Sequence, residues 1–523
     1  MNGNSSQALH RKGGLGFGTY PGQTLTDLAQ LGGGHAFAGE ETVKHPRSSD
    51  GGHELTVDPS RRPRLGHGYQ GLPETLSLGY ESVVWHRGST QEGTVGDRVE
   101  AGSIYGSYSG RHRIAFVATT PRSRKGAFME AMPSASRNLF RAALAIFIVT
   151  VVIGILNGTD LWDPPRNTLL THVHAGTLGW ITLSVFGGAI WMIGADVKTT
   201  RPMAMYAMLA VGAYVLAFWS VDLTDTVSIQ RPIGGILAFI AMVWVFVWAV
   251  RSMRGRSYNV AQFGMVLALA FLVFGAVLGV LLGLQLADVE VVAAENADRL
   301  GASHPGAMVA GYVVLAGLAL IEWLIQDRVP TISESKIGAV QMVLLLLAGV
   351  VLVVGFLADS EELLQVGVPL QVIGALILLG RHGRRLAPAG WKGRAANRFV
   401  RVAVLGLLAV VVLIAVLITQ IVGGKDFEEV VHIALAFDHV NFLLVSTSLI
   451  FAMMSLGSKV TEATNNLVFS GLTVGAAGFV VGLLLQENVM KRIFTPILGL
   501  ALLYGIYTYL TAAPAEVREG VSV

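Results

Sequence analysis

Residues 138–157 read NLFRAALAIFIVTVVIGILN, a run of twenty residues with Arg141 as its one charged side chain. About twenty apolar residues in a helix cross the ~30 Å hydrocarbon core of a bilayer. Backbone N–H and C=O groups find no partners in lipid, so a spanning run of this kind must be helical. Eleven similar runs follow, at 168–194, 203–223, 232–252, 261–284, 304–326, 336–358, 363–381, 399–423, 430–456, 463–485 and 491–513. The sequence therefore predicts an all-α polytopic membrane protein with twelve transmembrane helices.

The composition agrees with this prediction and excludes several classes of protein. Of the 523 residues, 52% are hydrophobic and only 14% are charged, whereas a soluble chain carries about 25% charge. A water-soluble enzyme, a disordered protein and a nucleic-acid binder are thereby excluded. The chain has no cysteine, which excludes disulfides, thiolate metal ligands and haem attached through cysteine. A metal would have to be held by His, Met, Asp or Glu.

The chain divides into a polar segment and a membrane domain. Residues 1–135 are rich in Gly, Ser and Arg and contain no spanning run. They predict a disordered cytoplasmic segment. The alternative is that translation begins at Met129 or Met132, just before the first apolar run. Residues 136–513 form the predicted twelve-helix domain, and 514–523 a short cytoplasmic tail.

Charges beside the apolar runs predict the orientation. With the N-terminus inside, eighteen Lys and Arg residues lie in or beside the inner loops and six in the outer ones. Positive charge favours the cytoplasmic side of a membrane. We therefore expect both termini in the cytoplasm and a multi-pass protein of the cytoplasmic, or inner, membrane. The lipid bilayer is its first expected partner.

Histidines concentrate at one depth of the predicted bundle. The second, sixth and tenth helices all run from outside to inside, so their first halves share the outer leaflet, within about 15 Å of depth. Polar groups in hydrocarbon are costly and usually face a cavity, a cofactor or each other. By contrast, His382 in the loop RHGRR is expected to be solvated. The outer-leaflet set comprises His172, His174, His304, His432 and His439, with Asp438 and Asn441 flanking the last.

Two neutral imidazoles from facing helices can ligate the iron of a b-type haem without any cysteine. We expect His174 and His439 to be the axial ligands, because Ala175 and Gly176 leave room beside the first. His172 points about 200° away from His174, so it is a reserve ligand or a neighbour of the ligands, as is His432. The set would hold one haem b, or two.

Three other interpretations of these residues stay open. The histidines could hydrogen-bond across helices and only hold the bundle together, and His304 could cap a helix that starts at Pro305. The His and Asp cluster could serve a proton-coupled or ion transporter. A purely structural or assembly role is the third alternative.

The pattern resembles subunit I of the haem-copper oxidase superfamily, which includes cytochrome c oxidases and nitric oxide reductases. The resemblance covers 138–513 and rests on THVHAGTLGW (171–180), HPGAMV (304–309) and DHVNFLL (438–444) in the second, sixth and tenth helices. A looser similarity is to NnrS-like membrane haem proteins. The resemblance implies an oxidase-like bundle, haem binding, respiratory electron transport and an oxidoreductase acting on O2 or NO. It also implies partner subunits or a cytochrome or quinol electron donor.

The departures from that family are specific. Its copper ion takes two histidines from the seventh helix, but residues 336–358 contain none. Met308 stands where a tyrosine would follow His304 by four residues, and Asn441 stands where the tenth helix would carry its second histidine. The resemblance therefore supports one bis-histidine haem and does not support a copper site.

Overall fold

The computed structural model describes residues 132–515, apart from 195, 221–228, 288, 327, 388–390 and 392. The expectations for residues 1–131 and 516–523 lie outside this range. Twelve helices in the described range are long and apolar enough to cross a membrane. They confirm the predicted polytopic helical membrane protein.

Nine of the twelve spans in the described range are continuous helices. Their ends agree with the predicted ones to within about one helical turn, except that the third begins earlier, at Val197. The eighth continues into a short 3-10 turn, η4 (Gly383–Leu386). The nine are α2 (Ser134–Gly158), α5 (Val197–Ser220), α6 (Gln230–Met253), α7 (Val260–Gln285), α10 (Lys336–Ala358), α11 (Glu361–His382), α12 (Ala395–Val422), α15 (Glu462–Leu484) and α16 (Asn488–Thr511).

The second, sixth and tenth spans are different, because each contains an eight-residue π-helical segment. These three spans, called the inner spans below, have 89%, 83% and 72% of their most apolar stretch buried, against 33–56% for the other described spans. They form the core, and the others surround it. The inner spans are α3 (Arg166–His174), η1 (Ala175–Thr182) and α4 (Leu183–Ile193); α8 (Ala294–Pro305), η3 (Gly306–Val313) and α9 (Val314–Leu324); and α13 (Phe427–His439), η6 (Val440–Thr447) and α14 (Ser448–Gly457).

Each π segment begins one or two residues after a histidine. η1 follows His174, η6 follows His439, and η3 follows the pair His304-Pro305. The sixth span corrects one prediction, because α8 starts at Ala294 and so His304 lies well inside a helix instead of capping its start. The ten residues before His304 are too polar to register as a membrane run, yet they continue the helix beyond the apolar stretch. π segments widen a helical turn and are frequent at functional sites.

Side-chain hydrogen bonds join the three π segments in a closed triangle. Trp180 of η1 donates its Nε1–H to Thr447 Oγ1 of η6 over 2.9 Å. Asn441 of η6 donates to the carbonyl of Val309 in η3 over 3.1 Å. Tyr312 of η3 donates to Thr182 Oγ1 of η1 over 3.4 Å. The inner spans are thereby fixed in rotation relative to one another.

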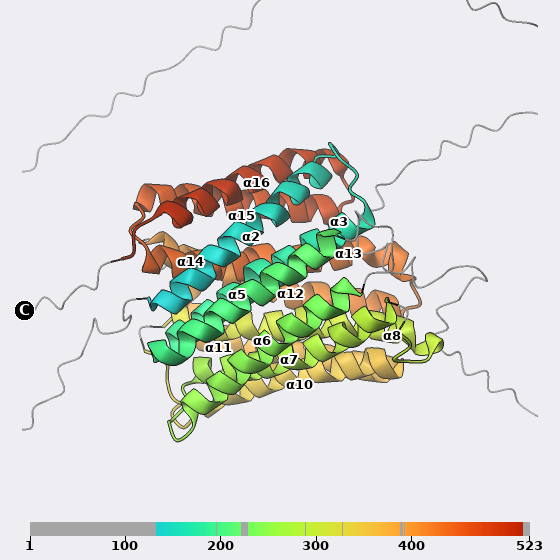
Figure 1. Cartoon of the computed structure of the whole chain (residues 1–523), viewed down its shortest axis with the longest axis horizontal. Coiled ribbons are helices and arrows are strands. Elements are labelled where there is room, and N and C mark those ends of the chain that lie inside the picture. The colour runs from blue at the N-terminus through green and yellow to red at the C-terminus, as the bar shows by residue number, and fades with distance from the viewer. Residues whose placement is uncertain are drawn as a thin grey trace, which may run out of the picture. The chain divides into compact units, whose positions relative to one another are not determined.

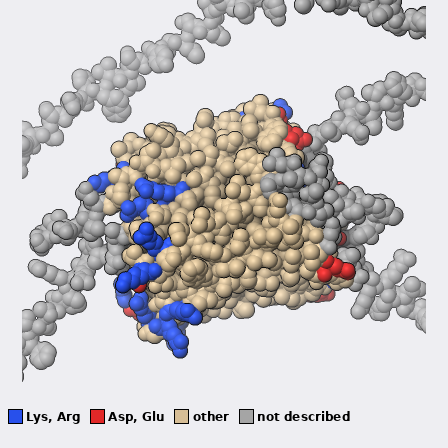
Figure 2. All heavy atoms as spheres, viewed as in Figure 1, with Lys and Arg blue, Asp and Glu red and all other residues tan. Residues whose placement is uncertain are grey.

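The two ends of the bundle carry opposite charge. Figure 2 shows most Lys and Arg of the visible face at one end and Asp and Glu at the other. The basic end is where α2 begins and α11 ends, with Arg137 and Arg385 among its residues. The acidic end is where α3, α8 and α13 lie (Figure 1), so the histidines that precede the π segments share that end.

Gly311 of η3 provides a test of this packing. A Cβ built there would overlap the ring of Phe271 in α7, and a Cβ on Gly349 of α10 would lie 3.1 Å from Cζ of the same ring. We expect Gly311→Ala to destabilise the protein by about 1–3 kcal/mol, the usual cost of overpacking. Thermal denaturation in detergent measures the loss. Gly380→Ala is the matched control, because a Cβ at Gly380 meets nothing within 4 Å; equal losses for both would contradict the packing argument.

Candidate functional site

His172 and His304 are held in matching ways by the helix that precedes their own span. Nδ1 of His172 lies 2.8 Å from the carbonyl oxygen of Thr150 in α2, and Nδ1 of His304 lies 3.0 Å from that of Gly275 in α7. Four residues further along each helix a glycine receives the ring, and a Cβ on Gly154 or Gly279 would lie 3.0 or 2.6 Å from the ring Cε1. A carbonyl can only accept, so both rings carry the proton on Nδ1 and leave Nε2 with its lone pair.

His174 and His439 form a second matching pair. Each is the last residue before a π segment. The Nδ1–H of His174 donates to the carbonyl of Leu170, and that of His439 to the carbonyl of Leu435, both over 2.7 Å and both four residues back in the same helix. Nε2 is again the nitrogen left to accept a hydrogen bond or bind a metal.

His172 and His439 lie within electrostatic range of each other. His304 and Arg231 are the groups within electrostatic range of His174. Its ring stacks on Phe218 of α5, with centroids 4.0 Å apart and planes inclined by 20°. The sequence-based pair of His174 with His439 stays a prediction. His172 and His174 have different neighbours because positions two apart on a helix point about 200° away from each other.

The remaining predicted site residues surround His439. Asn441 is fully buried, and its bond to Val309 makes it a link between the tenth and sixth spans. Asp438 is partly buried directly before His439, and His432 is partly buried two turns nearer the start of α13. The ring of His439 meets the ring of Phe479 in α15 edge-on, with centroids 5.0 Å apart.

The donor set fits haem better than a bare metal ion. In the described part of the chain, no three His, Cys, Asp or Glu side chains are grouped so that they could hold a metal ion. Haem iron needs only two axial imidazoles, since the macrocycle supplies the other four nitrogens. Histidines that bind metals usually donate their second N–H to a carbonyl or carboxylate, as His172 and His439 do.

A second buried polar cluster lies at the basic end and was not expected from the sequence. His382, predicted to be solvated, is the last residue of α11 and only 4% of its side chain is exposed. Its Nε2 lies 2.9 Å from Oε1 of Glu322, which is fully buried in α9. Arg381 pairs with both carboxylate oxygens of Glu322 and donates to Gln341 of α10 over 2.7 Å. The prediction for His382 is therefore wrong.

The prediction for His382 is wrong because of Glu322, the one acidic residue deep in the sixth span. Glu322 sits in the apolar stretch VLAGLALIEWL, where an ionised carboxylate is stable only with a cation beside it. Arg381 supplies that cation, and His382 is carried inward beside it. The unusual acid in the sixth span was visible in the sequence, but its partners are 59 and 60 residues away. Within the described residues, His382 Nδ1 and Gln341 Nε2 are buried without a hydrogen-bond partner.

No protein-family model matches the chain, and no curated protein matches it. The resemblance to haem-copper oxidase subunit I therefore stays a prediction that rests on the three motifs of the inner spans. The function has to be argued from the geometry of the two clusters.

The basic-end cluster generates a stability prediction. Glu322→Gln leaves Arg381 buried without its counter-ion, and breaking a buried pair in this way costs about 3–5 kcal/mol. We expect a large fall in the thermal denaturation midpoint in detergent. Glu334→Gln is the control, because Glu334 pairs with Arg328 in an exposed loop, where such pairs contribute about 0–1 kcal/mol. A Glu322→Gln variant as stable as the control would show that the cluster is uncharged.

Proposed function

We propose that the protein is an integral membrane haem protein that binds b-type haem near the acidic end of its bundle. The observation that carries the proposal is that four histidines stand on the three inner spans, each with its Nδ1–H committed to a backbone carbonyl. In this proposal His172 and His439, which lie within electrostatic range of each other, would hold the haem iron. The pair of His174 and His439 is the alternative from the sequence, and His304 is the residue for a second haem or for lining the first.

The chain's own residues prepare the ligand nitrogens. The carbonyls of Thr150 and Leu435 hold the two rings as Nδ1–H tautomers, so each Nε2 keeps the lone pair that iron needs. Gly154 lets the ring of His172 lie against α2. The surrounding apolar helices exclude water, which stabilises a hydrophobic macrocycle and controls its potential.

A bis-histidine haem, when bound, supplies one-electron transfer, and haem with a free axial position binds O2 or NO. Either activity would place the protein in respiratory electron transport, as the resemblance implies, with a cytochrome or quinol donor and other respiratory subunits as partners. Catalysis as an oxidoreductase is the further step in this proposal. We propose no copper site, because α10 carries no histidine.

A proton-coupled or ion transporter is the second candidate. The observation in its favour is that buried ionisable groups occur at both ends of the bundle. The histidines lie at the acidic end, and Glu322 with Arg381 and His382 lies at the basic end. Intramembrane groups of this kind serve proton relays in transporters.

Absorbance of the purified protein separates the two candidates. We expect a reduced-minus-oxidised band of low-spin haem b in the full-length protein purified from cells supplied with haem. His172→Ala and His439→Ala should each abolish that spectrum, whereas His174→Ala should retain it. His382→Ala is the control, because it removes a histidine at the opposite end of the bundle and should retain the spectrum.

The other outcomes are equally informative. Loss of the spectrum in His174→Ala with retention in His172→Ala would restore the pair expected from sequence. A colourless, folded protein despite excess haem would overturn the haem proposal. Proteoliposomes with an imposed pH gradient would then test transport, and the transporter requires that Glu322→Gln or His439→Ala reduce proton flux.

A further inference from the structure

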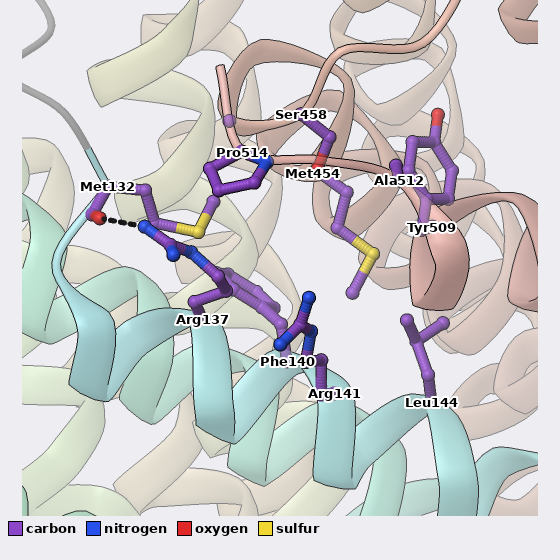
Figure 3. A pocket seen from close by; sticks show the side chains of 11 residues that line it. Met132, Arg137, Phe140, Arg141, Leu144, Met454, Ser458, Tyr509, Ala512 and Pro514 are labelled. Carbon is purple, nitrogen blue, oxygen red and sulfur yellow. Dashed lines mark hydrogen bonds between the residues drawn. The ribbon is translucent and has the colours of Figure 1, made fainter. Parts of the chain in front are cut away.

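A shallow, open hollow lies at the basic end, where α2 begins and α14 and α16 end. The chain after α16 closes one side, since Lys459 N–H donates to the Ala513 carbonyl and Ala515 N–H to the Gly457 carbonyl. Figure 3 shows the side chains that line it. None of the residues proposed to hold haem is among them.

Two arginines and an apolar wall define the chemistry of the hollow. Arg137 and Arg141 are one turn apart on α2, and both line the hollow (Figure 3). The wall beside them is formed by Phe140, Leu144 and Met454, which are buried in the core. The accessible part of the hollow is therefore cationic.

Within the described part of the chain, the charge and the N–H donors of these two arginines are only partly matched by partners. Arg137 donates from Nη2 to the Met132 carbonyl over 3.2 Å, but its buried Nε has no hydrogen-bond partner there. Neither Arg137 nor Arg141 forms a salt bridge with a described carboxylate. A guanidinium has five N–H donors and binds phosphate oxygens in pairs. An anion of the phosphate type satisfies the donors that the protein leaves open.

We propose that this hollow binds one anionic phospholipid of the leaflet at the basic end. Its phosphate sits on Arg137 and Arg141, and its acyl chains stay in the surrounding bilayer. The position selects a lipid over a soluble anion, because the arginines stand at the first turns of a membrane span. Basic residues at this level attract acidic lipids.

Native mass spectrometry of the full-length protein from mixed phosphatidylglycerol and phosphatidylcholine nanodiscs tests the proposal. We expect one retained phosphatidylglycerol in the wild type and its loss in Arg137→Gln/Arg141→Gln, with affinity weaker by roughly thirtyfold for two basic contacts. Arg254→Gln/Arg256→Gln is the matched control, because it removes two exposed charges from the loop after α6 at the same end and should retain the lipid.

A charge-preserving variant and the contradicting outcomes complete the experiment. Arg137→Lys/Arg141→Lys keeps the charge and should keep part of the binding, which covers the case that the glutamine variant does not fold. Equal lipid retention in both glutamine variants would overturn the proposal. Complete displacement of the retained phosphatidylglycerol from the wild type by inorganic phosphate alone would also overturn it, because that result would indicate a site for a free anion. Binding that appears only after residues 516–523 are removed would also overturn it, because the chain itself would then be the occupant.

Discussion

The hydrogen bonds between the three π segments are the constraint on which the rest of the structure depends. Trp180, Tyr312 and Asn441 each connect their own inner span to a different one. In a bilayer the hydrophobic effect does not drive helices together, so close packing and interhelical hydrogen bonds have to fix the arrangement. Once the inner spans are fixed in rotation, the surrounding spans can bury only one face each. The triangle therefore also determines where the histidines point.

Similar histidine environments recur on the inner spans. Inner spans occur at every fourth position along the chain, and His304 lies 130 residues after His174 and 135 before His439. His172 and His304 use the same device, a carbonyl and a glycine four residues apart on the preceding helix. Such repetition places imidazoles with equal tautomers on separate walls of the core. That arrangement suits a flat cofactor held from two sides more than a compact metal ion.

The two clusters at opposite ends follow different physical rules. At the acidic end the histidines are partly buried and are anchored by backbone carbonyls. At the basic end Glu322 is buried as an acid and requires Arg381, which draws His382 inward with it. The first cluster leaves ring nitrogens available for a ligand. The second uses nearly all its groups on itself, which suits a structural tie between α9, α10 and α11 or a proton site.

The sequence by itself determined the twelve spans, the unequal charge of the two ends and the gathering of the histidines near one of them. Apolar length, loop charge and position along a helix are local properties, so they can be read without knowing any contact. Only the tertiary structure decided that His172 and His174 have different neighbours, that His382 is buried, and that the sixth span starts at Ala294. These features depend on the rotation of each helix and on partners tens to hundreds of residues away, because a side chain's surroundings in a bundle are set by the facing helices and not by its own.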